Sequence, residues 1–178
     1  MIFLIRLFFK KYWFKLNYRK LFSAHKIIRD LSLVQFIAYF GAWFSNVAIY
    51  TMLVDFGSSE MAISVVTAMH FLPAILIAPF SGAIIDRVKI KPLMITLLAT
   101  ELLMTILFLT IDNKDDLWLL MILIFVRMSA ASMFFSTEMS LLAKLLRGKP
   151  LQMANEIHSI IWSFTYAAGM AVSGFVVN

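Results

Sequence analysis

The sequence predicts an all-α membrane protein with five transmembrane helices, preceded by a basic, amphipathic N-terminal segment. The composition supports this fold class. Of the 178 residues, 62% are hydrophobic, and the mean hydropathy is +0.88, whereas soluble domains are nearer half apolar. The apolar residues also form blocks long enough for a helix to cross a bilayer, which takes about 20 residues. Finally, 14 of the 16 lysines and arginines lie in three segments outside these blocks, a pattern typical of cytoplasmic loops.

Residues 1–30 contain eight basic residues and a single acid, Asp30, with aromatic and aliphatic residues between them. A secretory signal would place its charges before its apolar stretch. Here the apolar start, residues 1–9, is too short to span, and most of the charges follow it. Two interpretations stay open for this segment. It is either a helix that lies in the interface of an anionic leaflet or a basic cytoplasmic extension that fixes the orientation of the chain.

Five apolar segments are long enough to cross the bilayer at a rise of about 1.5 Å per residue. The predicted spans are residues 31–54, 61–85, 92–111, 117–143 and 157–177. In the first span, Gly41 and Ser45 are small residues four positions apart, a spacing that permits close helix approach in membranes. The second span contains Pro73 and Pro79, and we expect a kink there because proline removes a backbone hydrogen bond.

The connecting segments differ in charge. Residues 1–30, 86–91 and 144–149 are basic, whereas the turns 55–60 and 112–116 are mainly acidic. Because cytoplasmic loops carry an excess of lysine and arginine, this asymmetry predicts a multi-pass protein of the cell (inner) membrane whose N-terminus is cytoplasmic. With five spans, the residue at position 178 then lies on the outer side.

Charged residues inside the spans are the candidate functional residues, because a charge at the bilayer centre costs at least about 2.5–3.5 kcal/mol and normally faces a partner or a cavity. Glu101 lies nine residues, or about 14 Å, from Pro92. Arg127 lies ten residues, or about 15 Å, from Leu117. Both are therefore near the midplane, and an ion pair between them is one expectation. The alternative is a protonated Glu101 that bonds to another neighbour, with Arg127 facing cavity water.

Two other ionisable residues receive structural interpretations. We expect His70, in the second span, to be a neutral packing residue with a hydrogen bond. Glu138 lies about 31 Å from the outer end of the fourth span. We therefore expect it to reach the cytoplasmic interface as a solvated or salt-bridged residue.

Several functional classes are excluded by what the sequence lacks. There are no cysteines, so disulfides, thiolate metal sites and cysteine nucleophiles are excluded. There is no Walker-type loop of an ATP-driven pump, and no constellation of an intramembrane enzyme appears. The net charge of +6 is not gathered in one patch with interleaved aromatic residues, so nucleic acid is not an expected partner. The sequence predicts no enzyme activity, no cofactor and no metal.

A short basic hairpin, residues 86–91, joins the second and third spans. Gly82, Asp86, Arg87 and Lys91 match positions of the loop between the second and third helices of the major facilitator superfamily, roughly G-x-x-x-D-R-x-G-R-[RK]. Lys89 and Ile90 depart from that pattern.

Three further motifs follow in the same order. Arg127-Met-Ser-Ala-Ala-Ser resembles the family's R-x-x-x-G motif, with Ala131 in place of glycine. Gln152-Met-Ala-Asn155 is similar to the Ala-Asn before the fifth helix of exporters of the enterobactin and macrolide type. The stretch from Gly169 to Gly174 resembles the G-P-x-x-G-G of antiporters, without the proline and one glycine, and both glycines are candidates for helix packing.

The resemblance implies the N-terminal half of a transporter, with five of twelve helices. Such a protein would export a small hydrophobic or amphipathic compound by secondary active transport. Asp86 and its hairpin would act as a cytoplasmic gating latch, although Arg87 and Lys91 could equally serve as topology anchors. The fourth helix of the family lines the central cavity, which makes Arg127, with Glu101, a candidate for substrate binding or proton coupling.

The expected partners are the lipid bilayer, the small-molecule substrate and the remainder of the transporter, meaning the sixth helix and the C-terminal half. Without that remainder we expect no transport. The alternative to a transporter is a non-transporting membrane remnant or an assembly subunit that uses its helices for interaction.

Overall fold

The computed structural model describes residues 18–177, and residues 1–17 of the predicted basic segment 1–30 lie outside this range. The all-α prediction is confirmed. Five of the described helices are long and apolar enough to cross a membrane. The elements are α2 (Tyr18–Ala24), α3 (Lys26–Asp55), α4 (Glu60–Arg87), α5 (Ile90–Leu107), the 3-10 turns η1 (Phe108–Thr110) and η2 (Lys114–Asp116), α6 (Leu117–Leu145) and α7 (Gly148–Val177).

The helices continue beyond the apolar blocks, most clearly at the start of α7. This helix begins at Gly148, before the apolar segment that starts at residue 157. Gly148 has φ = +56°, a left-handed conformation that favours glycine, and it reverses the chain after α6. Pro150 follows in the first turn of α7, where its missing N–H has no intrahelical partner to lose. The first two turns of this membrane helix therefore lie before the predicted apolar span and contain both polar and apolar residues.

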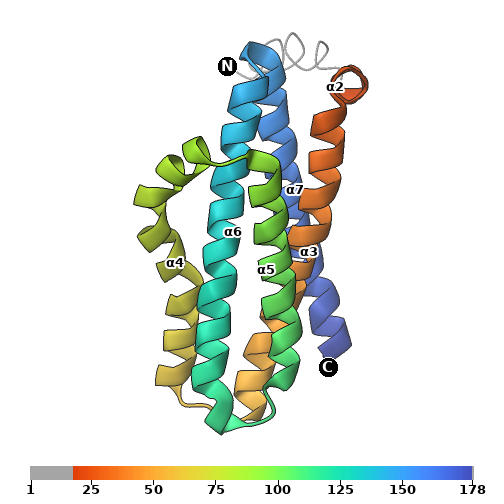
Figure 1. Ribbon diagram of the computed structural model, residues 1–178. Helices are drawn as coiled ribbons and strands as arrows, with labels where there is room; N and C mark the ends of the chain where they lie inside the picture. The colour runs from red at the N-terminus through yellow and green to blue at the C-terminus, as the bar shows by residue number, and fades with distance from the viewer. Residues whose placement is uncertain (1–17, 178) are drawn as a thin grey trace, which may run out of the picture.

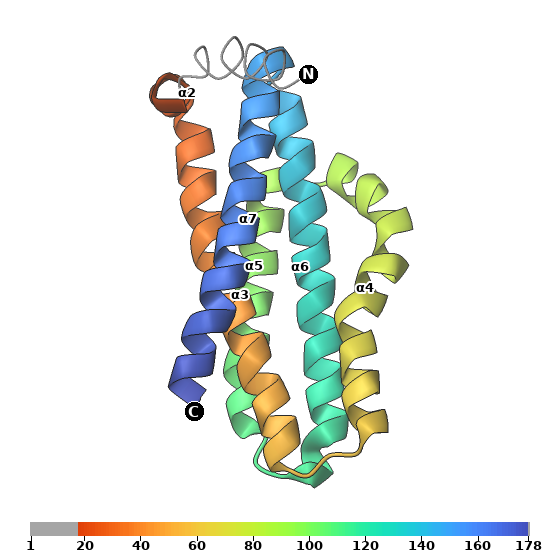
Figure 2. The ribbon, with the colours of Figure 1, turned by 180° about the vertical axis from the view of Figure 1, so that it is seen from behind.

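Helix α4 bends midway along its length and leans away from α6 beyond the bend (Figures 1 and 2). Pro73 and Pro79 both lie inside this helix. Each removes one backbone hydrogen bond and crowds the preceding turn, which is the usual cause of a sharp kink. The expected kink in the second span is therefore present.

The bundle consists of two groups of packed helices (Figure 1). In one group α3 packs along α7, and in the other α6 packs between α4 and α5. Two buried apolar clusters join the groups, one toward each end of the bundle. The inner cluster lies at the end that carries the α6–α7 turn and contains Leu21, Ile28, Leu31, Met94, Phe134, Leu142, Leu146, Met153, Ala154 and Ile157. The outer cluster contains Ile49, Leu53, Val66, Ile111, Leu120, Leu123 and Ile124.

Helix α2 is seen nearly end-on in both views, so it runs across the end of α3 and does not continue along it (Figures 1 and 2). Leu21 of α2 is buried in the inner cluster. The hydroxyl of Tyr18 donates a hydrogen bond of 2.9 Å to the Glu156 carboxylate of α7. Partial burial, together with this carboxylate, raises the pKa of Tyr18 above its ordinary value. The described part of the basic N-terminal segment is therefore attached to the bundle.

Candidate functional site

Arg127 connects the two helix groups near the middle of the bundle. Its side chain is buried, and its guanidinium group leaves α6 to reach α3. There it donates to the Ser45 hydroxyl at 2.8 Å, to the Ala42 carbonyl at 3.2 Å and to the Asn46 side-chain oxygen at 3.4 Å. The guanidinium carbon also lies 5.5 Å from the centre of the Phe108 ring, within the range of a cation–π contact. A rigid fork of donors suits arginine to such convergent acceptors.

A cavity of about 420 Å³ lies beside Arg127, between α3, α5 and α6. Its lining residues are Val34, Ile37, Ala38, Gly41, Ala42, Leu98, Glu101, Leu102, Thr105 and Arg127. Most of this surface is apolar, and Glu101 and Arg127 are its charged residues. Ile37 and Leu102, at its rim, are 65% and 63% exposed.

Glu101 and Arg127 thus lie on one cavity, but no direct ion pair between them is present within residues 18–177. The acceptors on α3 take the donors of Arg127 instead. Arg127 is also only 3% exposed, so the alternative of a side chain that faces cavity water without protein partners does not describe it either. The sequence did not predict these bonds to α3, because the depth of a residue in the membrane does not reveal toward which neighbouring helix its side chain turns.

The predicted gating hairpin is shorter than expected, because α4 continues to Arg87 and α5 begins at Ile90. The Asp86 carboxylate accepts from the Lys144 amine at 3.1 Å. This exposed ion pair joins the ends of α4 and α6. Gly82 is exposed, and a Cβ added there would meet no atom within 4 Å. Packing inside the described bundle therefore does not require glycine at position 82.

The four residues proposed for close helix packing have different environments. A Cβ added at Gly169 would lie 3.0 Å from the Trp43 Cβ and 3.1 Å from the Phe40 carbonyl oxygen. The backbone of α7 therefore approaches α3 closely at this point. Gly41 and Gly174 have open space where a Cβ would be added, and Ser45 serves as an acceptor for Arg127.

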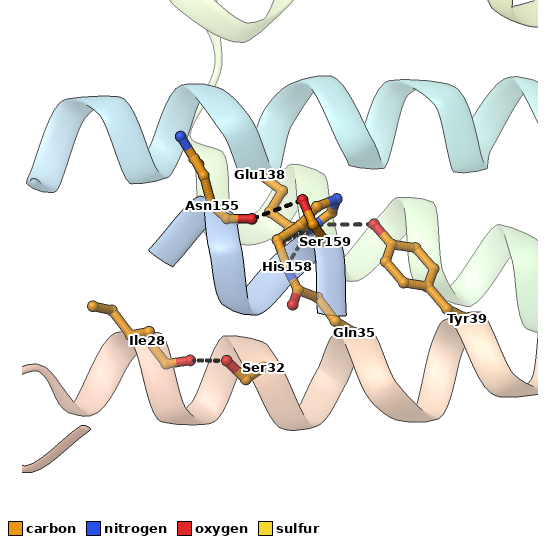
Figure 3. A network of polar contacts seen from close by, with 8 residues as sticks. All are labelled: Ile28, Ser32, Gln35, Tyr39, Glu138, Asn155, His158 and Ser159. Carbon is orange, nitrogen blue, oxygen red and sulfur yellow. Dashed lines mark hydrogen bonds and ion pairs between the residues drawn. The ribbon is translucent and has the colours of Figure 1, made fainter. Parts of the chain in front are cut away.

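A buried polar cluster lies closer to the α6–α7 turn (Figure 3). The Tyr39 hydroxyl of α3 donates to one carboxylate oxygen of Glu138 at 3.1 Å. The other oxygen of Glu138 lies 3.2 Å from Nδ1 of His158 on α7. The same Nδ1 lies 2.9 Å from Nε2 of Gln35. Gln35, Glu138 and His158 are 2%, 0% and 7% exposed.

The expectation of a solvated Glu138 was wrong, because Glu138 is fully buried, in contact with Tyr39 of α3 and His158 of α7. A partner is present, but it is a buried histidine instead of a residue at the interface. The sequence did contain one usable signal. Glu138 lies eight residues before Leu146 and His158 lies eleven residues after Arg147, and antiparallel helices joined by a short turn bring residues within about one turn of the same height near each other.

His70 occupies the core of the other helix group. Its Nδ1 lies 3.0 Å from the Val66 carbonyl, and its ring stacks on Tyr50 at 5.7 Å between centres. This agrees with a hydrogen-bonded packing residue. Within residues 18–177, no three His, Cys, Asp or Glu side chains are grouped in a way that could hold a metal ion.

Comparison with known proteins shows to which family the chain belongs. Residues 31–178 match the model of the Major Facilitator Superfamily. The chain is also 25% identical, over 160 residues, to the uncharacterized MFS-type transporter YfiS of Bacillus subtilis (strain 168). That match covers 89% of this chain and 38% of the relative's length. No solved structure matches the chain. Since the family model covers all five membrane helices, the chain belongs to the major facilitator superfamily of multi-pass membrane transporters.

Proposed function

We propose that this chain forms part of an ion-gradient-driven exporter of small hydrophobic or amphipathic compounds in the cell (inner) membrane. The observation that carries the proposal is the cavity between α3, α5 and α6. Its volume of about 420 Å³ lies within the range of about 300–1,000 Å³ typical of ligand pockets. An apolar lining with few polar groups is also typical of such pockets. Glu101 and Arg127 would then contact the substrate.

The exposed rim of the cavity favours a ligand that reaches it from an apolar phase. Ile37 and Leu102 stand at this rim and are mostly exposed. A compound with an apolar body would bury its body against these residues and direct its polar group toward Glu101 or Arg127. The exporters of the enterobactin and macrolide type, which the fifth span resembles, support the choice of export over import.

The cavity is testable with the amphipathic cation ethidium, whose fluorescence increases in apolar sites. The purified chain in lipid nanodiscs should bind ethidium, and Glu101→Gln should weaken binding about tenfold because the attraction of the carboxylate is removed, a change of about 1.4 kcal/mol. Glu60→Gln is the matched control, since Glu60 is exposed at the start of α4, away from the cavity. Equal binding by both variants and the parent chain would contradict a role for Glu101.

A lack of binding of ethidium and of any amphipathic anion would favour the other candidate, a membrane remnant or assembly subunit.

The full proposal also includes a partner, the sixth helix and the C-terminal half of a transporter. Asp86 would act there as a latch, exchanging Lys144 for a helix N-terminus of the partner in one conformation. A carboxylate at such a terminus gains about 0.3–1 kcal/mol when exposed, enough to bias a two-state equilibrium.

The proposed orientation has the N-terminus in the cytoplasm, and single cysteines can test it because the chain has none of its own. Asp115→Cys, in the exposed turn before α6, should react with an impermeant maleimide in intact cells. Ser23→Cys, exposed on α2, should react only after the membrane is permeabilised. A cysteine at Ser58, in the turn between α3 and α4, is less suitable for this experiment, because the Ser58 hydroxyl is buried. The reverse labelling pattern would contradict the orientation.

A further inference from the structure

The end of the bundle that carries the α6–α7 turn also carries α2, which lies at the height of the lipid headgroups. Helix α2 runs across the end of α3 (Figures 1 and 2). His25, between the two helices, precedes the apolar part of α3 at Leu31 by six residues, or about 9 Å along a helix. Glu156, to which α2 is bonded, directly precedes the apolar part of α7. Since headgroups occupy about 5–8 Å beyond the hydrocarbon core, α2 lies in their layer and roughly in the plane of the membrane.

The two sides of α2 differ as the sides of an interfacial helix do. Leu21 is buried in the inner cluster, and Tyr18 and Phe22 pack against that cluster. Arg19 is exposed, as is Lys26 at the start of α3. Helices that lie in a membrane interface combine an apolar face with a basic one. Here the bundle covers the apolar face of α2, and the basic side remains open to the membrane surface.

Two acids, Asp30 and Glu156, belong to the segments that meet at α2, and neither neutralises its basic side. Asp30 is paired with the neighbouring arginine at 3.3 Å, and Glu156 accepts hydrogen bonds from two neutral side chains. In the described part of the chain, no ion pair involves Arg19, Lys26 or Lys149. Lys149 is exposed and stands seven residues before Glu156, which is about two turns along the same face of α7. Helices α2, α3 and α7 therefore each carry an unpaired cation at this end.

The opposite end of the bundle has the reverse charge. Its turns, residues 55–60 and 112–116, contain five acids and a single basic residue, Lys114. Lys114 donates to the backbone carbonyl of Gly57. A negatively charged membrane surface attracts basic groups that lie within a Debye length of it, about 10 Å or less. Such a surface therefore complements the end with α2 and not the other end.

We propose that α2, with the first turns of α3 and α7, forms a binding surface for the headgroups of anionic phospholipids such as phosphatidylglycerol. Arg19, Lys26 and Lys149 donate to the phosphate oxygens, and the planar fork of Arg19 suits a bidentate contact. The bond from Tyr18 to Glu156 holds α2 against α7 at the height of these phosphates. A bound lipid then connects the ends of three helices that α2 alone holds together on this side.

The surface lies apart from the cavity, and the proposal does not rest on the proposed export of substrates. A lipid is the occupant that fits best, because the basic side of α2 lies in the membrane plane at headgroup height. Free phosphate would share the chemistry of the contact, and an acidic protein would share its charge. Both sources enter the experiment as competitors.

Native mass spectrometry of the full chain in a mild detergent counts bound lipids during titration with phosphatidylglycerol or phosphatidylcholine. Phosphatidylglycerol should bind at least about fivefold more tightly. Arg19→Gln and Lys26→Gln should each weaken its binding about fivefold, which corresponds to about 1 kcal/mol per basic residue at an anionic membrane surface. Neither variant should change the binding of phosphatidylcholine. Lys114→Gln, at the opposite end, is the matched control for net charge and should behave like the parent chain.

Equal affinity of the parent chain for the two lipids would overturn the proposal. So would unchanged binding of phosphatidylglycerol in both glutamine variants, or an equal loss in Lys114→Gln, since the lipid would then bind elsewhere or follow net charge alone. Arg19→Lys retains the charge and should retain most of the binding. Displacement of the lipid by inorganic phosphate or polyglutamate at equal concentration would identify a free anion or an acidic protein as the occupant instead. The measurement contains no substrate, so its failure would leave ethidium binding at the cavity as a separate result.

Discussion

Replacement of Arg127 by methionine should weaken binding of the amphipathic anion 1-anilinonaphthalene-8-sulfonate about 10- to 100-fold. Arg127 is a cationic residue of the cavity wall, and one hydrogen bond to a charged group contributes about 1.5–3 kcal/mol, which corresponds to that range in affinity. The measurement is a fluorescence titration of the purified chain in nanodiscs. Arg127→Lys should fall between the parent chain and Arg127→Met, because lysine retains the charge but loses the planar fork.

The same replacement should change the stability of the fold much less than it changes binding. Three bonds from Arg127 to α3 are lost, and bonds between membrane helices contribute about 0.6 kcal/mol on average and up to about 1.7. The charge that costs about 2.5–3.5 kcal/mol to bury is removed as well, so the two effects largely offset each other. Lys114→Met, in the exposed turn before α6, is the control for charge alone. Unchanged binding of the anion by Arg127→Met would contradict a ligand-contacting role.

Replacement of Gly169 by leucine should separate α3 from α7 and sharply lower the yield of folded protein. Even a Cβ at this position would lie 3.1 Å from the Phe40 carbonyl oxygen and 3.2 Å from the Phe44 nitrogen. Both are backbone atoms of α3, which cannot turn aside as a flexible side chain would. Overpacking usually costs about 1–3 kcal/mol, and a leucine against backbone should reach or exceed the upper value. Size-exclusion profiles and thermal unfolding in detergent measure the effect.

Gly174→Leu is the matched control on the same helix, since an added Cβ there meets nothing within 4 Å. It should purify and unfold like the parent chain. Gly169→Ala should lie between the two, because its single methyl group requires a shift of only a few tenths of an ångström. If Gly169→Leu is as stable as Gly174→Leu, the close approach of α3 and α7 is not a determinant of stability.

The apolar blocks of the sequence determined the membrane helices. Segments such as 31–54 contain no charge. A backbone buried in lipid must make all its hydrogen bonds within the protein, and a helix makes them within a single segment. The order of the motifs, from the hairpin at residues 86–91 to the fifth span, identified the family. The sequence also predicted that Glu101 and Arg127 lie at a common depth, because the rise per residue converts sequence position into height along a helix. In the structure both residues line one cavity.

What only the tertiary structure decided is the direction of each polar side chain around its helix axis. The position of a residue along its helix does not give the direction of its side chain around the helix axis. That direction is set by packing against the neighbouring helices. For this reason Arg127 bonds to α3 and not to Glu101, and Glu138 is enclosed instead of solvated. For the same reason Gly169 meets the backbone of α3 while Gly174, five residues on, faces open space where a side chain would stand.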